Sequence, residues 1–287
     1  MLNNRYRSTP ILSLFISLLL SFASAAGLVE DHLVEVQILS VNDFHGSLLP
    51  SDTTGGAAYL ATYLRQREAE NPHTLIVHAG DMVGASPVVS SLLQDEPTIE
   101  VLQLIGFHLG VPGNHEFDEG LAELQRLIYG GRHDATSYFA GMGFPLILAN
   151  AVDKQTGDPI LPPYAIRVVA GVPLGFIGVC TLETPSIVMP GGIADLDFID
   201  PVEAIDRWVP ELQARGIETI VVLAHEGGLQ LKDGTIIGPI ADIARAVDDE
   251  VDIIISGHTH TYINGTVDGK LIVQAGHHGA AFADIDV

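Results

Sequence analysis

Five short runs of acidic, amide and imidazole side chains recur along this chain. They are Asp43-Phe44-His45, Gly80-Asp81, Asn114-His115-Glu116-Phe117-Asp118, Ala224-His225-Glu226 and Gly257-His258-Thr259-His260. Together these side chains form the kind of ligand set that binds divalent metal ions. Each run begins where an apolar, β-branched stretch ends, so all five can converge on one edge of a sheet. The pattern therefore predicts a two-metal site for hydrolysis.

In two of the runs, two potential metal ligands lie two residues apart. Asp43 and His45 follow a predicted strand, and side chains at this spacing leave a strand on the same face, where they can hold one ion. His258 and His260 repeat the spacing after a second strand. Asp-x-His alone is a weak signal, and a lone Gly-Asp is more often a turn. At Asp81, however, the preceding glycine lets the backbone turn and a ligand approach closely.

The run from Asn114 to Asp118 divides into different chemical tasks. The carbonyl oxygen of Asn114 is an uncommon but competent hard ligand, whereas His115 points elsewhere and is free for proton chemistry. Asp118 can accept a hydrogen bond from one ring nitrogen of His115 and so fix which nitrogen faces a substrate. Asp118 is also a candidate helix N-cap, and the two roles can coexist. His225 ends another strand and adds a further imidazole.

Buried strands and amphipathic helices must position these side chains. The apolar runs that predict strands are Val34 to Val41, Thr74 to His78, Leu146 to Ala149, Ile166 to Val169, Leu174 to Val179, Thr219 to Leu223, Ile253 to Ile255 and Leu271 to Val273. The helical faces lie within 59–64, 121–128, 200–216 and 240–247. Ala170-Gly171 predicts a hairpin turn, so we expect a mixed sheet.

Proline and glycine mark the predicted breaks between these elements. Asp200-Pro201 predicts a helix start, Pro210 a kink or a break inside that helix, and Gly216 its end. Two stretches, 130–143 and 183–197, are rich in Gly, Pro and polar residues. We expect both to be irregular loops over or beside a site.

The N-terminus predicts export. Arg5 and Arg7 precede an apolar run from Ile11 to Phe22 and then Ala23-Ser24-Ala25-Ala26, the order of a secretory signal peptide. We therefore expect a signal peptide over 1–26, one catalytic domain over 27–287, and a periplasmic or secreted protein. A retained signal anchor is the competing interpretation. No second apolar segment is long enough to span a bilayer, so no stable membrane span is expected after cleavage.

The amino-acid composition limits the kinds of molecule that the protein is expected to bind. The net charge of -23 argues against binding a nucleic acid polymer through its phosphates. An acidic protein still binds small phosphate esters if metal ions supply the local positive charge. Cys180 is the only cysteine, so no internal disulfide forms, and its apolar surroundings predict a buried packing residue.

In their order and strand context, the five motifs resemble the calcineurin-like metallophosphoesterases. The resemblance is to the N-terminal catalytic domain of the 5'-nucleotidase and 2',3'-cyclic-nucleotide phosphodiesterase group, and it covers the chain from about Val34 to its end. It implies a four-layer α/β/β/α sandwich of two mixed sheets, which is an α/β fold. It also implies a hydrolase for a small phosphate ester such as a nucleotide.

The resemblance also implies roles for individual residues. One divalent ion is held by Asp43, His45 and His260, the other by Asn114, His225 and His258, and Asp81 bridges the two. A metal-activated hydroxide attacks phosphorus, while His115, oriented by Asp118, stabilises the transition state and protonates the leaving group. This ligand set suits Zn, Mn, Fe or Co and does not choose among them.

The chain departs from the family pattern in a few places. His108 stands where relatives commonly have an aspartate, and we interpret it as a change in packing or in the residues that surround the ligands, not as a ligand. His78, His277 and His278 lie near the motifs but are left out of the predicted ligand set. The chain stops at Asp284-Ile285-Asp286-Val287, within a predicted strand, and we expect the C-terminal domain that recognises the nucleoside to be absent from it.

Three functional hypotheses remain open from the sequence. The first is an exported nucleotide phosphoesterase, either a 5'-nucleotidase or a 2',3'-cyclic-nucleotide phosphodiesterase with 3'-nucleotidase activity. The second keeps the metals but changes the substrate, as in sugar-nucleotide hydrolases or thiosulfohydrolases. The third is an inactive metal-binding extracellular domain, although a purely structural site has no use for the additional proton donor His115. The sequence determines neither the ester, the base, the metal nor the oligomeric state.

Overall fold

The computed structural model describes residues 33–287, and the predicted signal peptide over 1–26 lies outside them. Residues Val34–Val287 form one compact unit. Within the described range, no helix has both the length and the apolar character needed to cross a membrane.

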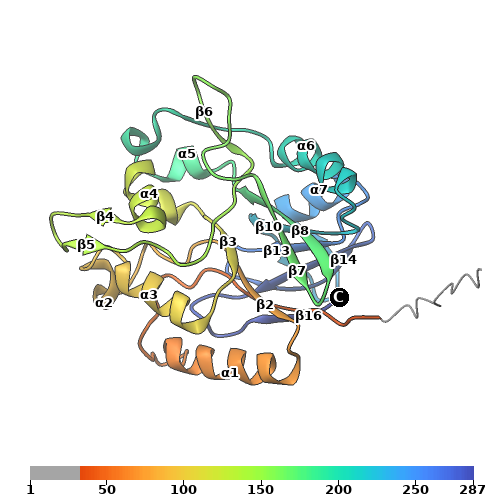
Figure 1. The fold of residues 1–287 in the computed structure, drawn as a ribbon, viewed down its shortest axis with the longest axis horizontal. Coiled ribbons are helices and arrows are strands. Elements are labelled where there is room, and N and C mark those ends of the chain that lie inside the picture. Colours follow the sequence, from red (N-terminus) through yellow and green to blue (C-terminus); the bar gives the residue numbers. More distant parts are fainter. Residues whose placement is uncertain (1–32) are drawn as a thin grey trace, which may run out of the picture. The chain divides into compact units, whose positions relative to one another are not determined.

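A four-stranded sheet carries the first three site motifs (Figure 1). Its order is β16-β1-β2-β3, built from Ala283–Asp286, Gln37–Val41, Thr74–Ala79 and Leu109–Val111. β1, β2 and β3 are parallel, while β16 is antiparallel to β1. All five residues of β1 and all six of β2 are buried, which explains their continuous apolar sequences. The carboxyl ends of the three parallel strands therefore meet at one edge.

A six-stranded sheet carries the other two motifs. Its order is β14-β15-β13-β10-β8-β7, built from Tyr262–Val267, Lys270–Ala275, Ile253–Ser256, Thr219–His225, Val172–Cys180 and Tyr164–Val169. β8, β10, β13 and β15 are parallel, whereas the two outer strands are antiparallel to their neighbours. Ala170 and Gly171 form the turn between β7 and β8, both at positive φ, so the predicted hairpin is confirmed.

The remaining elements are helices and three short ladders. The α-helices are α1 Gly56–Glu70, α2 Val88–Ser91, α3 Glu96–Ile105, α4 Leu121–Tyr129, α5 Thr184–Ile187, α6 Pro201–Ala214 and α7 Pro239–Ala246, with 3-10 turns η1 His115–Phe117 and η2 Pro190–Ile193. The ladders pair β4 Gly131–Arg132 with β5 Tyr138–Phe139, β6 Ala151–Asp153 with β9 Leu196–Phe198, and β11 Leu229–Gln230 with β12 Ile236–Ile237.

The two large sheets pack against each other and each is covered by helices. Along β10, Val221 and Leu223 belong to the core shared with β1, β2 and α1, while Ile220 and Val222 belong to the core under α6 and α7. This alternation sends successive side chains to opposite faces of the six-stranded sheet. Figure 1 shows α1 on one side of the sheets and α6 and α7 on the other. The predicted α/β fold with two mixed sheets is confirmed, and the arrangement fits four layers.

Two details of the predicted elements were wrong, and at Pro210 a break, one of the two predicted alternatives, is excluded. Leu146 to Ala149 is not a regular strand: the amide of Ile147 donates to the carbonyl oxygen of Gly110 in β3, and that of Ala149 donates to Gly178 in β8, so the segment passes from one sheet to the other. The stretches 130–143 and 183–197 are not wholly irregular, because they contain short ladders and helical turns. Pro210 does not break α6, which ends before Gly216 as expected.

Candidate metal centre

Each residue of the predicted metal site lies at the carboxyl end of a strand in one of the two large sheets. The four-stranded sheet provides Asp43 and His45 after β1, Asp81 after β2, and Asn114 after β3; the six-stranded sheet provides His225 at the end of β10, and His258 and His260 after β13. Because the parallel strands of each sheet end at a common edge, seven residues from five loops lie in one cluster.

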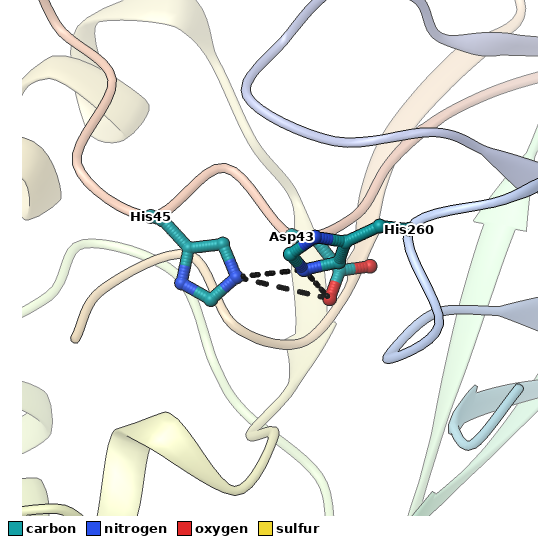
Figure 2. Close-up of side chains that lie close together, drawn as sticks. All are labelled: Asp43, His45 and His260. Atoms are coloured by element: carbon teal, nitrogen blue, oxygen red, sulfur yellow. Dashed lines mark hydrogen bonds and ion pairs between the residues drawn. The ribbon is translucent and has the colours of Figure 1, made fainter. Parts of the chain in front are cut away.

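One group of potential ligands consists of Asp43, His45 and His260, drawn in Figure 2. The Nε2 atoms of the two histidines are 3.1 Å apart, and Nε2 of His260 lies 3.3 Å from Oδ1 of Asp43. Nδ1 of His45 lies 3.0 Å from the carbonyl oxygen of Gly84, which accepts its N–H in the tautomer that leaves Nε2 unprotonated. Three potential donor atoms thus face one point, as ligands of a single ion do.

A second group consists of Asp81, His225 and His258. Nε2 of His225 lies 3.1 Å from Oδ2 of Asp81 and 3.2 Å from Oδ1 of Asn114. Nδ1 of His225 donates to the carbonyl oxygen of Ala79 at 2.8 Å, which aims Nε2 at the cluster. Oδ2 of Asp81 also lies 3.9 Å from Nε2 of His45 in the first group. Asp81 is therefore placed between the two groups, as the predicted bridge requires.

The backbone at the cluster is held in an uncommon conformation. Asp43, His45, Asp81, His258 and His260 all have φ between 48° and 72°, in the left-handed region that costs a non-glycine residue about 1 to 3 kcal/mol. Such conformations concentrate at functional sites, where the surrounding fold must hold them in place. The left-handed backbone that orients these five side chains therefore lowers the stability of the protein.

Two glycines allow the loops to approach each other. Gly80 has a φ of 85°, and a Cβ on it would lie 2.5 Å from Nδ1 of His225. A Cβ on Gly113 would lie 2.1 Å from Oδ1 of Asp81. Neither position has room for a side chain, which confirms the expected role of glycine before Asp81.

The charge of the cluster suits divalent cations. Asp43 and Asp81 are buried, and no lysine or arginine between residues 33 and 287 forms an ion pair with either of them. Burial alone lowers the pKa of His225, but the carboxylates of Asp81 and Asp43 outweigh it and raise this pKa to about 10. Burial likewise raises the pKa of Asp81, yet His225 lowers it overall. In the metal-free protein, protonated His225 thus supplies positive charge beside Asp81, and a bound metal ion would supply that charge in its place.

The predicted pair of His115 and Asp118 lies beside this cluster. Nδ1 of His115 is 2.7 Å from Oδ2 of Asp118, and this hydrogen bond raises the pKa of the imidazole despite its partial burial. The ring of His115 contacts that of His45 edge to face at 5.1 Å between centroids. Asp118 is not the N-cap of α4, because Gly120 occupies that position. Its carboxylate is thus committed to His115.

Glu116 belongs to the site although its role was not predicted. Its buried carboxylate accepts hydrogen bonds from the backbone amides of Asp81, Met82, Val83 and Gly113. Burial, followed by the charge of Asp81, raises the pKa of Glu116 to about 7, while the amide donors favour the ionised form. One side chain thus joins the loop of the bridging residue to the loop of Asn114. Only its position inside the Asn114 to Asp118 run indicated importance.

Other histidines noted in the sequence occupy distinct surroundings. His78 packs against Phe107 and Phe144, and its Nε2 is buried without a hydrogen-bond partner. His108 immediately precedes β3, and its Nδ1 accepts a hydrogen bond from the amide of Ile76 in β2, so this side chain links the two strands. In contrast, His277 and His278, which were left out of the predicted ligand set, lie against the first ligand group.

Comparisons with known proteins agree on one protein family. Residues 36–262 match the model of the calcineurin-like phosphoesterases. The chain is 46% identical over 271 residues to "Endonuclease YhcR" of Bacillus subtilis, covering 90% of this chain and 22% of that protein. It is 37% identical to "Cell wall protein Lmo0130" of Listeria monocytogenes, covering 96% and 39%. It is 30% identical to a 5'-nucleotidase of Vibrio cholerae, covering 80% and 41%.

Solved structures agree on the fold. A putative 5'-nucleotidase from Staphylococcus aureus superposes with a TM-score of 0.74 at 23% identity, covering 88% of this chain and 51% of that one. The chain spans about a fifth to two fifths of the length of these sequence relatives.

Proposed function

The chain belongs to the calcineurin-like phosphoesterase family, and from that premise we propose that it is an exported dinuclear-metal phosphoesterase that hydrolyses nucleotide phosphate esters. The observation that carries the proposal is the position of Asp81 between two complete ligand groups, with His115 beside it. Asp43, His45 and His260 would hold one ion, and Asn114, His225 and His258 the other. Asp81 would bridge them.

Each part of this arrangement has a separate task. When bound, a pair of divalent ions lowers the pKa of water and neutralises charge on a phosphoryl group. Asp118 holds Nδ1 of His115, so Nε2 is the nitrogen free to face the substrate. From there it can stabilise charge on a phosphoryl oxygen and give a proton to the departing alkoxide. The hydrogen bond to Asp118 favours the protonated imidazole that this step needs.

Relatives guide the choice of substrate and location. A 5'-nucleotidase among them supports a nucleotide monoester, with a 2',3'-cyclic nucleotide as the second candidate on the same scaffold. A cell wall protein among them supports export, in agreement with the predicted signal peptide. The net charge of -23 disfavours a nucleic acid polymer, but one relative is named an endonuclease, so an oligonucleotide is included among the test substrates.

The test is hydrolysis by protein that has been dialysed against chelator and then supplied with Mn²⁺ or Zn²⁺. We expect metal-dependent hydrolysis of p-nitrophenyl phosphate, and of 5'-AMP or 2',3'-cyclic AMP. No metal-dependent hydrolysis of any of these esters, nor of bis-p-nitrophenyl phosphate, would support an inactive metal-binding domain instead.

His115→Ala tests the assigned mechanism. Because general acid catalysis contributes about 10² to 10⁴-fold, we expect turnover to fall by at least about 10²-fold while metal content remains unchanged. His73→Ala, a histidine just before β2, is the matched control and should retain full turnover. Unchanged turnover in His115→Ala would rule out the assigned role.

A further inference from the structure

His277 and His278 follow β15 and lie against the first ligand group. The ring of His277 stacks on His260 with centroids 4.6 Å apart and planes at 15°. The ring of His278 meets that of His45 edge to face at 5.7 Å. The amide of His278 donates to the carbonyl oxygen of Asp43 at 2.7 Å, so the backbone of this segment is fixed to the metal-binding loop. Both imidazoles therefore have a defined position at the site.

The ring nitrogens of His277 and His278 make no contact that would explain them as structural hydrogen-bonding groups in the described part of the chain. Within the part of the chain that the structure describes, no hydrogen bond or ion pair involves a ring nitrogen of His277 or His278. Neither belongs to the two ligand groups described above, nor to a third set of converging atoms from His45, Asp81 and His115. Both side chains are half-buried, which leaves them open to a bound molecule. Each neutral imidazole carries one N–H that can donate to such a molecule.

Among the described residues, the site is not paired with the cations that usually bind phosphate. No lysine or arginine within residues 33–287 bonds to a predicted site residue, and the buried Arg126 is held by Glu96 and Glu123 instead. A further carboxylate, that of Glu183, approaches Nε2 of His258 at 3.4 Å. Two metal ions cannot contact every oxygen of a phosphoryl group, so its remaining negative oxygens need hydrogen-bond donors.

We propose that His277 and His278 are substrate-binding residues whose imidazole N–H groups donate hydrogen bonds to the anionic oxygens of the phosphoryl group. The proposal rests on the function proposed above and names the residues that take the place of arginine or lysine. The ligand that it predicts for this pair is a phosphate ester or the inorganic phosphate that hydrolysis releases. Both residues would act on binding, and His115 would remain the proton donor.

The test compares phenylalanine variants, which keep an aromatic ring but remove the N–H. Inorganic phosphate is titrated calorimetrically into the Mn²⁺-loaded full chain, wild type and His277→Phe/His278→Phe, and metal per chain is measured by mass spectrometry. The single variants replace the double variant if thermal unfolding shows that it does not fold. His278→Asn, which restores an N–H and tolerates the positive φ of 55°, tests for rescue. His73→Phe is the control.

The expected result is a selective loss of anion binding. The double variant should keep the metal content of the wild type, bind phosphate about tenfold or more weakly, and show a raised KM for p-nitrophenyl phosphate with kcat changed by less than about threefold. His278→Asn should recover part of the affinity lost in His278→Phe.

Two results would overturn the proposal. One is an unchanged phosphate affinity in the double variant. The other is the loss of about one metal ion per chain relative to the wild type, because His277 and His278 would then bind a third ion. Phosphate binding is measured without turnover, so it remains informative if the wild type hydrolyses none of the test esters. That last outcome would contradict the proposed function alone.

Discussion

Glu116 shows how one side chain controls the spacing of the candidate ligands. Its carboxylate accepts hydrogen bonds from the backbone amides of two loops. Asp81, Met82 and Val83 donate from one loop, and Gly113 donates from the other. An ionised carboxylate is the only side chain of this size that accepts at all of these points, since an amide presents one oxygen and one NH₂ donor. The identity of Glu116 thus matters more than its volume.

Glu116→Gln should therefore weaken both the fold and metal binding. Hydrogen bonds to a charged group contribute about 1.5 to 3 kcal/mol each. In the variant, the NH₂ group of the glutamine side chain would face backbone N–H groups and could not accept from them. We therefore expect the free energy of unfolding to fall by about 2 to 4 kcal/mol. Urea denaturation of the metal-free protein measures this loss, and metal per chain after dialysis should also fall. The nearby exposed Glu119→Gln is the control. Equal stability and metal content in both variants would contradict the assigned role.

His78 predicts a pH dependence from a residue outside the predicted ligand set. Burial, reinforced by the neighbouring His225, lowers the pKa of His78 to about 3, below its ordinary value of 6.5. The unfolded chain therefore binds this proton at a higher pH than the folded chain does. The stability due to neutral His78 is complete above the unfolded pKa and is lost as the pH falls from there toward the folded pKa.

His78→Leu should remove this component of acid sensitivity. Between about pH 6 and pH 4 we expect the free energy of unfolding of the wild type to fall more steeply than that of the variant, by about 1.4 kcal/mol per pH unit. Urea denaturation of the metal-free proteins measures both slopes, so that metal release does not contribute. His73→Leu should keep the wild-type slope. Parallel slopes for wild type and His78→Leu would show that His78 takes up its proton in the folded state too.

Among the elements, α6 illustrates how packing overrides a local signal. Pro210 lies inside this helix and has no N–H to donate to the carbonyl of Asp206 one turn earlier. The helix nevertheless continues, because Ile205, Val209 and Leu212 are fully buried against the six-stranded sheet. Pro210 itself is exposed, so its ring faces away from this core. Sequence predicted the helix and both of its ends but could not weigh that tertiary contribution.

Pro210→Ala should accordingly stabilise the protein. Proline costs a helix interior about 3 kcal/mol, and part of this is offset because proline also restricts the unfolded chain, so we expect a gain of about 1 to 2 kcal/mol and a higher Tm. Thermal unfolding compared with Gln213→Ala, an exposed substitution in the same helix, provides the measurement. A lower Tm for Pro210→Ala than for the wild type would mean that α6 is adapted to the proline.

The strand-end motifs were predictable for a related reason. An apolar run that ends in Gly-Asp or Gly-Asn-His carries its own signal, since parallel strands bring their carboxyl ends together whatever lies between them. The segment 146–149 has the same apolar character, but it bonds first beside β3 and then to β8, and nothing local encodes that transfer. Similarly, three of the four amides that bind Glu116 lie 33 to 35 residues upstream, and those contacts follow from the fold rather than from spacing.

At the scale of the whole molecule, the site joins the two large sheets. The first ligand group combines Asp43 and His45 from the four-stranded sheet with His260 from the six-stranded sheet. The second combines Asp81 with His225 and His258 in the same way. Each ion would thus act as a cross-link between sheets that otherwise meet through apolar side chains. Since buried carboxylates and left-handed backbone weaken the metal-free protein here, metal binding should contribute strongly to stability.

Asp43→Asn and His225→Gln test this coupling from opposite sheets. A ligand that binds only the folded state stabilises it by about 2.7 kcal/mol at a hundredfold excess over Kd, so we expect the wild-type Tm to rise clearly with Mn²⁺ or Zn²⁺. Each variant removes a ligand of a different ion and should show about half of that rise or less, because the other ion still binds. Asp268→Asn, in the exposed turn between β14 and β15, should retain the full rise.

Amide hydrogen exchange extends the test: metal should slow exchange in the loops after β1 and β10 together. If it protected the loops of one sheet only, the ions would not connect the two sheets.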